Sequence, residues 1–344
     1  MKTQFIAILA CSLIITGCSK AQTNTTTSST STSDTSSFAK GADIGWLSQM
    51  EASGIQFYNS NGQQQDCIAI LKSKNINSIR LRVWVNPAGG WCGTSDIIKQ
   101  AVRASNMGMK ILIDFHYSDY WADPGKQNKP KAWASLDFNS LVDTIYTYTK
   151  NVLTQLKNNN VIPDWVQIGN ETNDGMLWET GRASTSMSNF AAMINAGYKA
   201  VKEVNSSTKV IVHISNGYDN NLFRWMFDGL TKYNAQWDVI GMSLYPPVAS
   251  WQSTTTQCLV NMNDMINRYG KEIMICEIGM DVTQPDACKQ FITDIIQKVK
   301  SLPNHKGLGV FYWEPECHNN WQGYNMGAFD NSGKPTVAMD GFAN

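Results

Sequence analysis

Two glutamates, Glu171 and Glu277, each stand at the end of an apolar stretch with the composition of a buried β-strand. A carboxylate at such a position is costly to desolvate, so it usually either has a charged partner or performs chemistry. Two facing carboxylates can cleave a glycosidic bond if one protonates the leaving oxygen and the other, ionised, attacks the anomeric carbon. Glu171 is therefore the candidate acid/base and Glu277 the candidate nucleophile. For Glu171 taken alone, a structural carboxylate is an equal alternative.

The elements that would position these glutamates alternate between an apolar strand and an amphipathic helix, which is typical of parallel sheets. The expected strands are 41–46, 78–85, 110–117, 165–171, 209–215, 239–245, 273–278 and 309–313. The expected helices are 66–74, 96–107, 138–157, 188–204, 222–233, 259–269 and 291–300. Eight successive units predict an α/β fold, the (β/α)8 TIM barrel, with its active site at the C-terminal ends of the strands.

Polar and aromatic residues gather at the predicted strand ends, as expected of a catalytic barrel. Because side chains two residues apart on a strand share a face, Arg80, Arg82 and Trp84 should lie together. By the same rule Asp114 and His116 should lie together.

Residues at other strand ends could support the two glutamates. Arg80 could keep Glu277 ionised by pairing with it, and Asn170 could hold the 2-hydroxyl of a sugar. His116 and Tyr245 would complete the ring as hydrogen-bond partners.

Each of these residues also has a structural interpretation. An arginine beside a glutamate at a barrel end is a common stabilising arrangement, and a single histidine there is more often a satisfied polar residue than a catalyst. Trp313 taken alone would belong to the core. Glu314 and Glu316 are rival carboxylates, but Glu316 follows a proline beyond the strand end and Glu314 should point away from Trp313.

The N-terminus has the pattern of an export signal. Residues 1–17 combine a short charged start with an apolar run too short to span a bilayer. Cys18 follows small residues as in a bacterial lipobox, so we expect it to be lipidated; an ordinary signal cut nearby is the alternative. Residues 18–37 would then form a Ser/Thr-rich tether, and residues 38–344 a single catalytic domain. We expect an exported, membrane-anchored lipoprotein on the cell surface or in the periplasm.

Composition restricts the partners. The formal net charge is zero and the pI is about 6.9, which argues against a nucleic-acid ligand. The twelve Trp and twelve Tyr residues suit a cleft that stacks sugar rings. The sequence has no CxxC pair or histidine cluster, so we expect no structural zinc site.

The cysteines leave several possibilities open. Apart from Cys11 and Cys18, six cysteines would permit up to three disulfides in an exported protein. The local pairs to test first are Cys67 with Cys92 and Cys258 with Cys288, and Cys276 could equally be a buried free thiol.

Four stretches of the sequence resemble glycoside hydrolase family 53, the arabinogalactan endo-β-1,4-galactanases. They are GAD at 41–43, IRLRVWVNP at 79–87, DFHYSDYWADPGKQ at 114–127 and VQIGNETNDGMLW at 166–178. The resemblance implies retaining endo-hydrolysis of β-1,4-galactan by a monomer without a cofactor, with Glu171 as acid/base and Glu277 as nucleophile. It implies substrate contacts from Asp43, Arg80, Trp84, His116, Asn170, Tyr245 and Trp313, with Asp119 and Trp121 bordering the cleft.

The chain departs from the family pattern at two places. Gly45 stands where a serine is common, which could loosen a nearby contact. Some members bind calcium in a late loop, but no dense run of Asp and Asn occurs here, so we expect no required metal.

Two other functions compete with this interpretation. A glycosidase of the same clan could use the same glutamates on mannan, xylan or cellulose, although the stretch 114–127 favours galactan. A glycan-binding lipoprotein on a degenerate barrel would suit the anchor and the aromatic residues, but it would not need two intact carboxylates.

Overall fold

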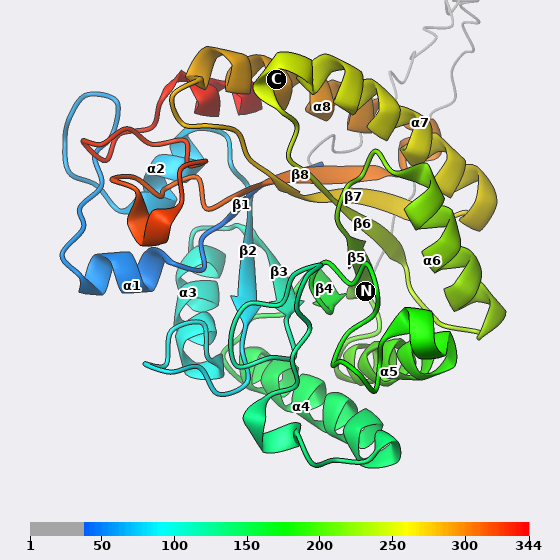
Figure 1. Cartoon of the computed structure of the whole chain (residues 1–344). Coiled ribbons are helices and arrows are strands. Elements are labelled where there is room, and N and C mark those ends of the chain that lie inside the picture. The colour runs from blue at the N-terminus through cyan, green and yellow to red at the C-terminus, as the bar shows by residue number, and fades with distance from the viewer. Residues whose placement is uncertain (1–37, 344) are drawn as a thin grey trace, which may run out of the picture. The chain divides into compact units, whose positions relative to one another are not determined.

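The computed structural model of the protein describes residues 38–343 and has eight parallel strands in a closed barrel. Each strand pairs with the next along the chain, and β8 pairs with β1 (Figure 1). The strands are β1 (Ala39–Asp43), β2 (Ser78–Val83), β3 (Lys110–Phe115), β4 (Trp165–Ile168), β5 (Lys209–Ile214), β6 (Val239–Leu244), β7 (Glu272–Ile278) and β8 (Gly307–Trp313). The predicted (β/α)8 barrel is confirmed. Cys18 and the predicted signal peptide and tether lie outside the described residues.

Helices surround the strands (Figure 1). The α-helices are α1 (Leu47–Ala52), α2 (Cys67–Ser73), α3 (Thr94–Asn106), α4 (Phe138–Asn158), α5 (Ala183–Val204), α6 (Asn220–Lys232), α7 (Trp251–Tyr269) and α8 (Pro285–Lys300). Short 3-10 helices are η2 (Lys131–Trp133), η3 (Val248–Ser250), η4 (Pro303–His305), η5 (Trp321–Gly323) and η6 (Val337–Ala343).

The sequence missed helix α1 and the first turns of several other helices. Six residues are too few to display a helical period, which explains why α1 was not predicted. Elsewhere the ends follow local chemistry: Asp137 caps α4 by accepting from Ser140 N at 2.8 Å, and Pro285 begins α8. Helix α7 ends at Gly270, whose φ of 67° an L-residue would adopt only with strain.

Strand β4 ends earlier than predicted. Its last residue is Ile168, and Gly169 turns the chain with a φ of 83°. The prediction that the strand extends to Glu171 is therefore wrong. Glu171 lies in the loop that follows, itself in the left-handed region at a φ of 44°. Such a conformation is uncommon for a glutamate and must be held by surrounding contacts.

The barrel interior has an apolar floor and a polar upper layer. The floor is one cluster of interior side chains: Ala39, Leu112, Trp165, Ile211, Val239, Met274, Cys276 and Phe311. Towards the C-terminal strand ends, the next interior positions are charged or polar; they include Arg80, Asp114, Gln167 and His213, all buried. The apolar side chains on the outer face of the strands pack beneath the helices. The polar layer therefore lies between a dry floor and the barrel mouth.

A bulge in β7 sets the direction of Glu277. Between the pairs Met242–Ile275 and Ser243–Glu277, β7 contains one extra residue, Cys276. Cys276 faces the interior, so regular alternation would place Glu277 on the outer face. The bulge turns Glu277 inward as well.

The disulfides that the sequence left open are absent from the described chain, including the two local pairs to test first. All six cysteines between residues 38 and 343, including Cys67 and Cys258, are free and buried. Their sulfurs contact other groups: Cys92 Sγ lies 3.3 Å from the Gly45 carbonyl oxygen, and Cys288 Sγ lies 3.5 Å from the Tyr312 hydroxyl. The thiols thus behave as small apolar core residues.

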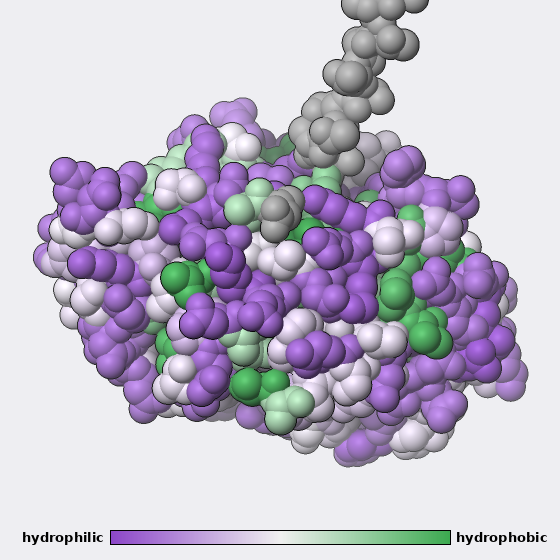
Figure 2. Space-filling model, turned by 90° about the horizontal axis from the view of Figure 1, so that it is seen from above, coloured by the Kyte–Doolittle hydropathy of each residue, from purple (hydrophilic) through white to green (hydrophobic). Residues whose placement is uncertain are grey.

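The surface is largely hydrophilic on the face shown in Figure 2, where apolar side chains form small separate groups. Single exposed apolar residues are normal on a water-facing surface. None of the helices within 38–343 has both the length and the apolar character needed to cross a bilayer.

Candidate active site

The buried guanidinium of Arg80 on β2 joins residues from the ends of four other strands. Its Nη1 lies 2.7 Å from Asp43 Oδ2 and 2.9 Å from Glu277 Oε1. Its Nη2 lies 2.8 Å from Asp114 Oδ2 and donates to Asn170 Oδ1 at 2.9 Å. Burial opposes ionisation of Asp114, but Arg80 and His116 still hold its pKa below the usual value. Arg80 therefore fixes three carboxylates and one amide around the barrel axis.

Glu277 and Glu171 have different surroundings. The Glu277 carboxylate contacts Arg80 and accepts a hydrogen bond from the Tyr245 hydroxyl at 2.9 Å. Burial raises the pKa of Glu277, Arg80 opposes that rise, and the charge of Glu171 adds to it. Glu171 is half-buried, and burial also raises its pKa. Two donors, Arg80 and Tyr245, hold the Glu277 carboxylate, whereas no ion pair to Glu171 is present among the described residues, so the two carboxyl groups differ in their partners.

Asn170 and His116 are held firmly beside these carboxylates. Asn170 Nδ2 donates to the Ala122 carbonyl at 2.9 Å, which leaves its second N–H for a ligand. His116 Nδ1 accepts from Trp84 Nε1 at 3.2 Å and from the Ala122 amide at 3.1 Å. Its Nε2 must then carry the proton, and it lies 3.0 Å from Asp114 Oδ2. Both ring nitrogens are thus occupied, as expected of a positioning residue.

Arg82 organises the aromatic side of the mouth. Its guanidinium carbon lies 4.4 Å from the centre of the Trp121 ring and 5.2 Å from that of Trp46, in cation–π geometry. The rings of Trp84 and Trp313 lie within 6 Å of the same carbon. A Cβ at Gly45 would stand 2.3 Å from Arg82 Nη1, so the glycine that departs from the family pattern leaves the space that this guanidinium fills.

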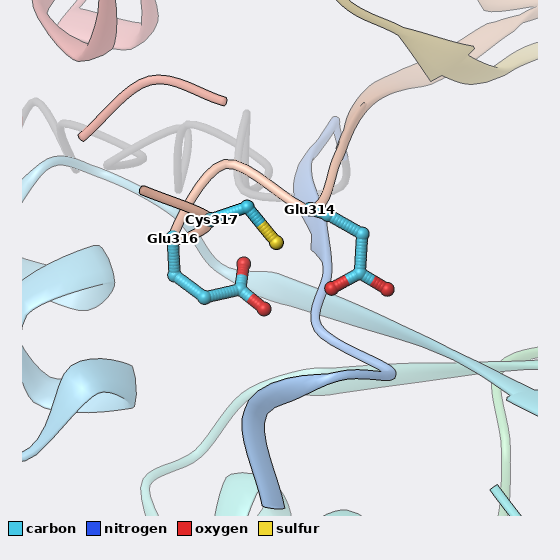
Figure 3. Close-up of side chains that lie close together, drawn as sticks. All are labelled: Glu314, Glu316 and Cys317. Carbon is cyan, nitrogen blue, oxygen red and sulfur yellow. The ribbon is translucent and has the colours of Figure 1, made fainter. Parts of the chain in front are cut away.

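Glu314 pairs with Arg82 and is itself close to a second buried acid. One carboxylate oxygen of Glu314, one of Glu316 and the sulfur of Cys317 lie within 4.8 Å of one another. Figure 3 shows the Glu316 carboxyl group directed towards Glu314. Burial, reinforced by the charge of Glu314, raises the pKa of Glu316 well above its usual value. Neither Glu316 carboxyl oxygen has a hydrogen-bond partner among the described residues. A protonated Glu316 would lower the cost of burying two acids side by side. That no metal is required stays a prediction.

A cavity of about 650 Å³ opens beside Arg82. Its walls include the indoles of Trp46, Trp84, Trp91, Trp121 and Trp313, the phenols of Tyr120 and Tyr324, and the polar side chains of Gln49, Asn86, Asp119 and Gln322. Flat aromatic faces interspersed with amide and carboxylate groups suit a chain of sugar rings.

The structure brings the predicted site residues together but does not expose all of them. Trp84, Asp119, Trp121 and Trp313 line the cavity. Asp43 and Arg80 are fully buried and pair with each other, while Arg80 Nε has no hydrogen-bond partner among the described residues. Their contacts with substrate stay a prediction.

Asp119 has a structural task as well as a place on the cavity wall. Its carboxylate accepts from the backbone amides of Asn86 at 2.9 Å and Lys131 at 2.8 Å. It thereby joins two loops that border the cleft.

Sequence reasoning missed several residues of the site. His213 and Gln167 lie in the polar layer, and Gln127 donates to the Asn170 carbonyl at 2.8 Å. The alternation rule could have placed His213 beside Ile211 on the inner face of β5. Trp46 was expected to end the strand 41–46, but β1 already ends at Asp43. Tyr324 occurs outside the strands, where no sequence period marks its direction.

Comparisons with known proteins agree with this architecture. The model of glycosyl hydrolase family 53 matches residues 39–342. The chain is 34% identical to an endo-β-1,4-galactanase of Bacillus subtilis over 81% of this chain and 70% of that protein. It is 32% identical to an arabinogalactan endo-β-1,4-galactanase of Thermothelomyces thermophilus over 82% and 90% of the two chains. The solved family 53 catalytic domain of Ignisphaera aggregans superposes with a TM-score of 0.82 at 32% identity, covering 89% of this chain and 95% of that one.

Arg82 offers a test of the buried charge network. Replacing it by methionine leaves Glu314 buried without its cation, so Arg82→Met should lower the free energy of unfolding by about 3–5 kcal/mol. The matched control is Arg103→Met, because Arg103 pairs with Glu51 and Asp66 while 29% of its side chain is exposed; that change should cost about 1 kcal/mol. Urea denaturation followed by tryptophan fluorescence measures both. Equal losses would contradict the network.

Proposed function

Because the chain belongs to glycosyl hydrolase family 53, we propose that this glycoside hydrolase is an endo-β-1,4-galactanase acting on β-1,4-galactan. The observation that carries the proposal is the pairing of Glu277, held by Arg80 and Tyr245, with the half-buried Glu171 at one barrel mouth. The adjoining aromatic cavity gives room for several sugar rings, which suits an enzyme that cuts within a polymer.

The proposed reaction retains the anomeric configuration. The Glu277 carboxylate attacks the anomeric carbon while Glu171 gives its proton to the glycosidic oxygen, so that the carbon–oxygen bond breaks and a glycosyl-enzyme ester forms. Glu171, now ionised, takes a proton from water, and the resulting attack releases the sugar and regenerates Glu277. The remaining N–H of Asn170 is placed to donate to the sugar 2-hydroxyl.

Arg80 and Tyr245 together support the ionised form of Glu277. The positive charge of Arg80 keeps the carboxylate ionised before attack, while Tyr245 fixes the orientation of the attacking oxygen. Glu171 has neither support, and burial favours its protonated form. Two chemically identical side chains thus receive opposite tasks from their surroundings.

Removing either carboxyl group should abolish cleavage of galactan. We expect Glu171→Gln and Glu277→Gln each to lower kcat/KM by about 100-fold or more, since general acid catalysis alone contributes that much. The control is Glu203→Gln on the outer surface of α5, which should leave activity unchanged. Reducing ends released from galactan, mannan, xylan and cellulose measure the rate and the specificity together. Full activity in either site variant would exclude the assignment, and faster release from another glycan would exclude galactan as the substrate.

The stereochemistry of the product tests the double displacement. If Glu277 forms a covalent intermediate, the first product observed by proton NMR should be the β-anomer, and the two carboxyl groups should stand about 5 Å apart in a crystal structure. An initial α-anomer, or a separation of about 9 Å, would indicate inversion with Glu277 acting on water.

We also propose that the enzyme is a lipoprotein anchored through Cys18 at the cell surface or in the periplasm. Supporting this, residues 1–17 have the pattern of an export signal, and small residues precede Cys18 as in a bacterial lipobox. Expressed in a bacterium with lipoprotein processing, the full chain should fractionate with membranes, and Cys18→Ala should release it. Membrane association that survives Cys18→Ala would contradict the anchor.

A further inference from the structure

His213 holds the loop corner that carries Glu171. Its carbonyl oxygen accepts from both the backbone amide of Thr172, at 2.9 Å, and the Thr172 hydroxyl, at 3.0 Å. Its ring nitrogen Nδ1 lies 3.3 Å from the backbone amide of Glu171. Three hydrogen bonds from one residue of β5 therefore reach two consecutive residues of the corner. They offset the cost of the left-handed backbone of Glu171.

The same contacts fix the protonation state of the His213 ring. A backbone amide can only donate, so Nδ1 must accept and cannot carry a hydrogen. The Gln167 side-chain amide, 3.0 Å away, can donate to the same nitrogen. Burial, assisted by the nearby charge of Arg80, lowers the pKa of His213 well below its usual value, so the ring is neutral. Its one N–H is therefore on Nε2.

From Nε2 the hydrogen bonds continue to Glu171. His213 Nε2 lies 2.8 Å from Ser243 Oγ, so the ring donates and the serine accepts. The serine hydroxyl is then free to donate onward to the Glu171 carboxylate, whose pKa it lowers. The β7 bulge makes Glu277 the register partner of Ser243 on the neighbouring strand β6. Ser243 is 1% exposed, so its hydroxyl is shielded from bulk water.

We propose that His213 and Ser243 are positioning residues of this active site: His213 fixes the backbone of Glu171, and Ser243 extends a hydrogen bond from His213 to the Glu171 carboxyl group. The inference rests on the proposed role of Glu171 as the acid/base. The chain of bonds from histidine through serine to glutamate favours the ionised carboxylate, which is the form needed when Glu171 deprotonates water. This effect opposes that of burial, which raises the pKa of Glu171 and so favours its protonated form.

Other charged and titratable groups face Glu171 and would remain in a Ser243 variant. They are Arg80 of β2, Asp114 of β3, Asp123 of the following loop, His213 of β5, Tyr245 of β6 and Glu277 of β7. Arg80 favours ionisation of Glu171, while Asp114 and Asp123 disfavour it. A change in proton affinity on removing the Ser243 hydroxyl would therefore report that hydroxyl alone.

The test is the pH profile of Ser243→Ala. Without the hydroxyl the Glu171 proton is held more tightly, so the alkaline limb of kcat/KM on galactan should move to higher pH by about 0.5–1 unit. The pH profile of kcat/KM for a dinitrophenyl β-1,4-galactobioside should not shift, because its leaving group needs no proton. The matched control is Ser78→Ala, which removes a buried serine hydroxyl bonded to Asn77 at the opposite end of the barrel. It should leave the limb in place.

Two variants of His213 separate its two tasks. His213→Gln can still donate to Ser243 but has no acceptor at the position of Nδ1, where the Glu171 amide is held. Its kcat should therefore fall by about tenfold while the alkaline limb of the pH profile stays in place. His213→Asn keeps an acceptor near Nδ1 but cannot reach Ser243, so the limb should move as in Ser243→Ala. His213→Asn also decides the question if Ser243→Ala does not fold.

The outcomes distinguish this inference from the proposed function. If Glu171→Gln is inactive but the limb of a folded Ser243→Ala enzyme stays in place or moves to lower pH, the positioning role is wrong. A shift of equal size in Ser78→Ala would overturn it too. If Glu171→Gln keeps full activity on galactan, the proposed function fails instead.

Discussion

The scarcity of positive charge inside the barrel mouth is the constraint on which the site depends. Five carboxyl groups are buried there or just above it, on Asp43, Asp114, Glu277, Glu314 and Glu316, and the two buried arginines Arg80 and Arg82 are their cationic partners. Two cations cannot neutralise five anions at low dielectric, so some of the carboxyl groups must hold protons. The contacts with the two arginines determine which carboxyl groups hold protons.

This constraint separates the roles of the glutamates. Glu277 and Glu314 each contact an arginine, whereas Glu171 and Glu316 do not. Glu316 is fully buried, and burial raises its pKa well above the usual value. Glu171 is only half-buried, as its proposed role as proton donor requires. The same shortage of cations therefore produces a structural acid at one strand end and a candidate catalytic acid at another.

Arg82 connects the charge network to the aromatic cavity. Its guanidinium lies among four indoles and pairs with Glu314, while the Glu314 carboxylate also accepts from the Trp46 amide at 3.2 Å. Rings held by a buried ion pair lose little freedom when a sugar packs on them, because their positions are already set. The cavity and the carboxylate pair thus share one framework of buried polar contacts.

By itself the sequence determined the eight strands and the barrel and pointed to two candidate glutamates. Apolar runs bounded by turn residues are local signals, and the C-terminal ends of parallel strands meet at one edge. It also indicated the family through the stretch from Asp114 to Gln127. Only the tertiary structure decided the direction of Glu277, since an unpredictable bulge at Cys276 reverses the alternation rule. The free thiols, the burial of Asp43 and the contacts of His213 were likewise beyond the sequence. Each depends on which distant side chains fill the same space, and a linear pattern does not record that.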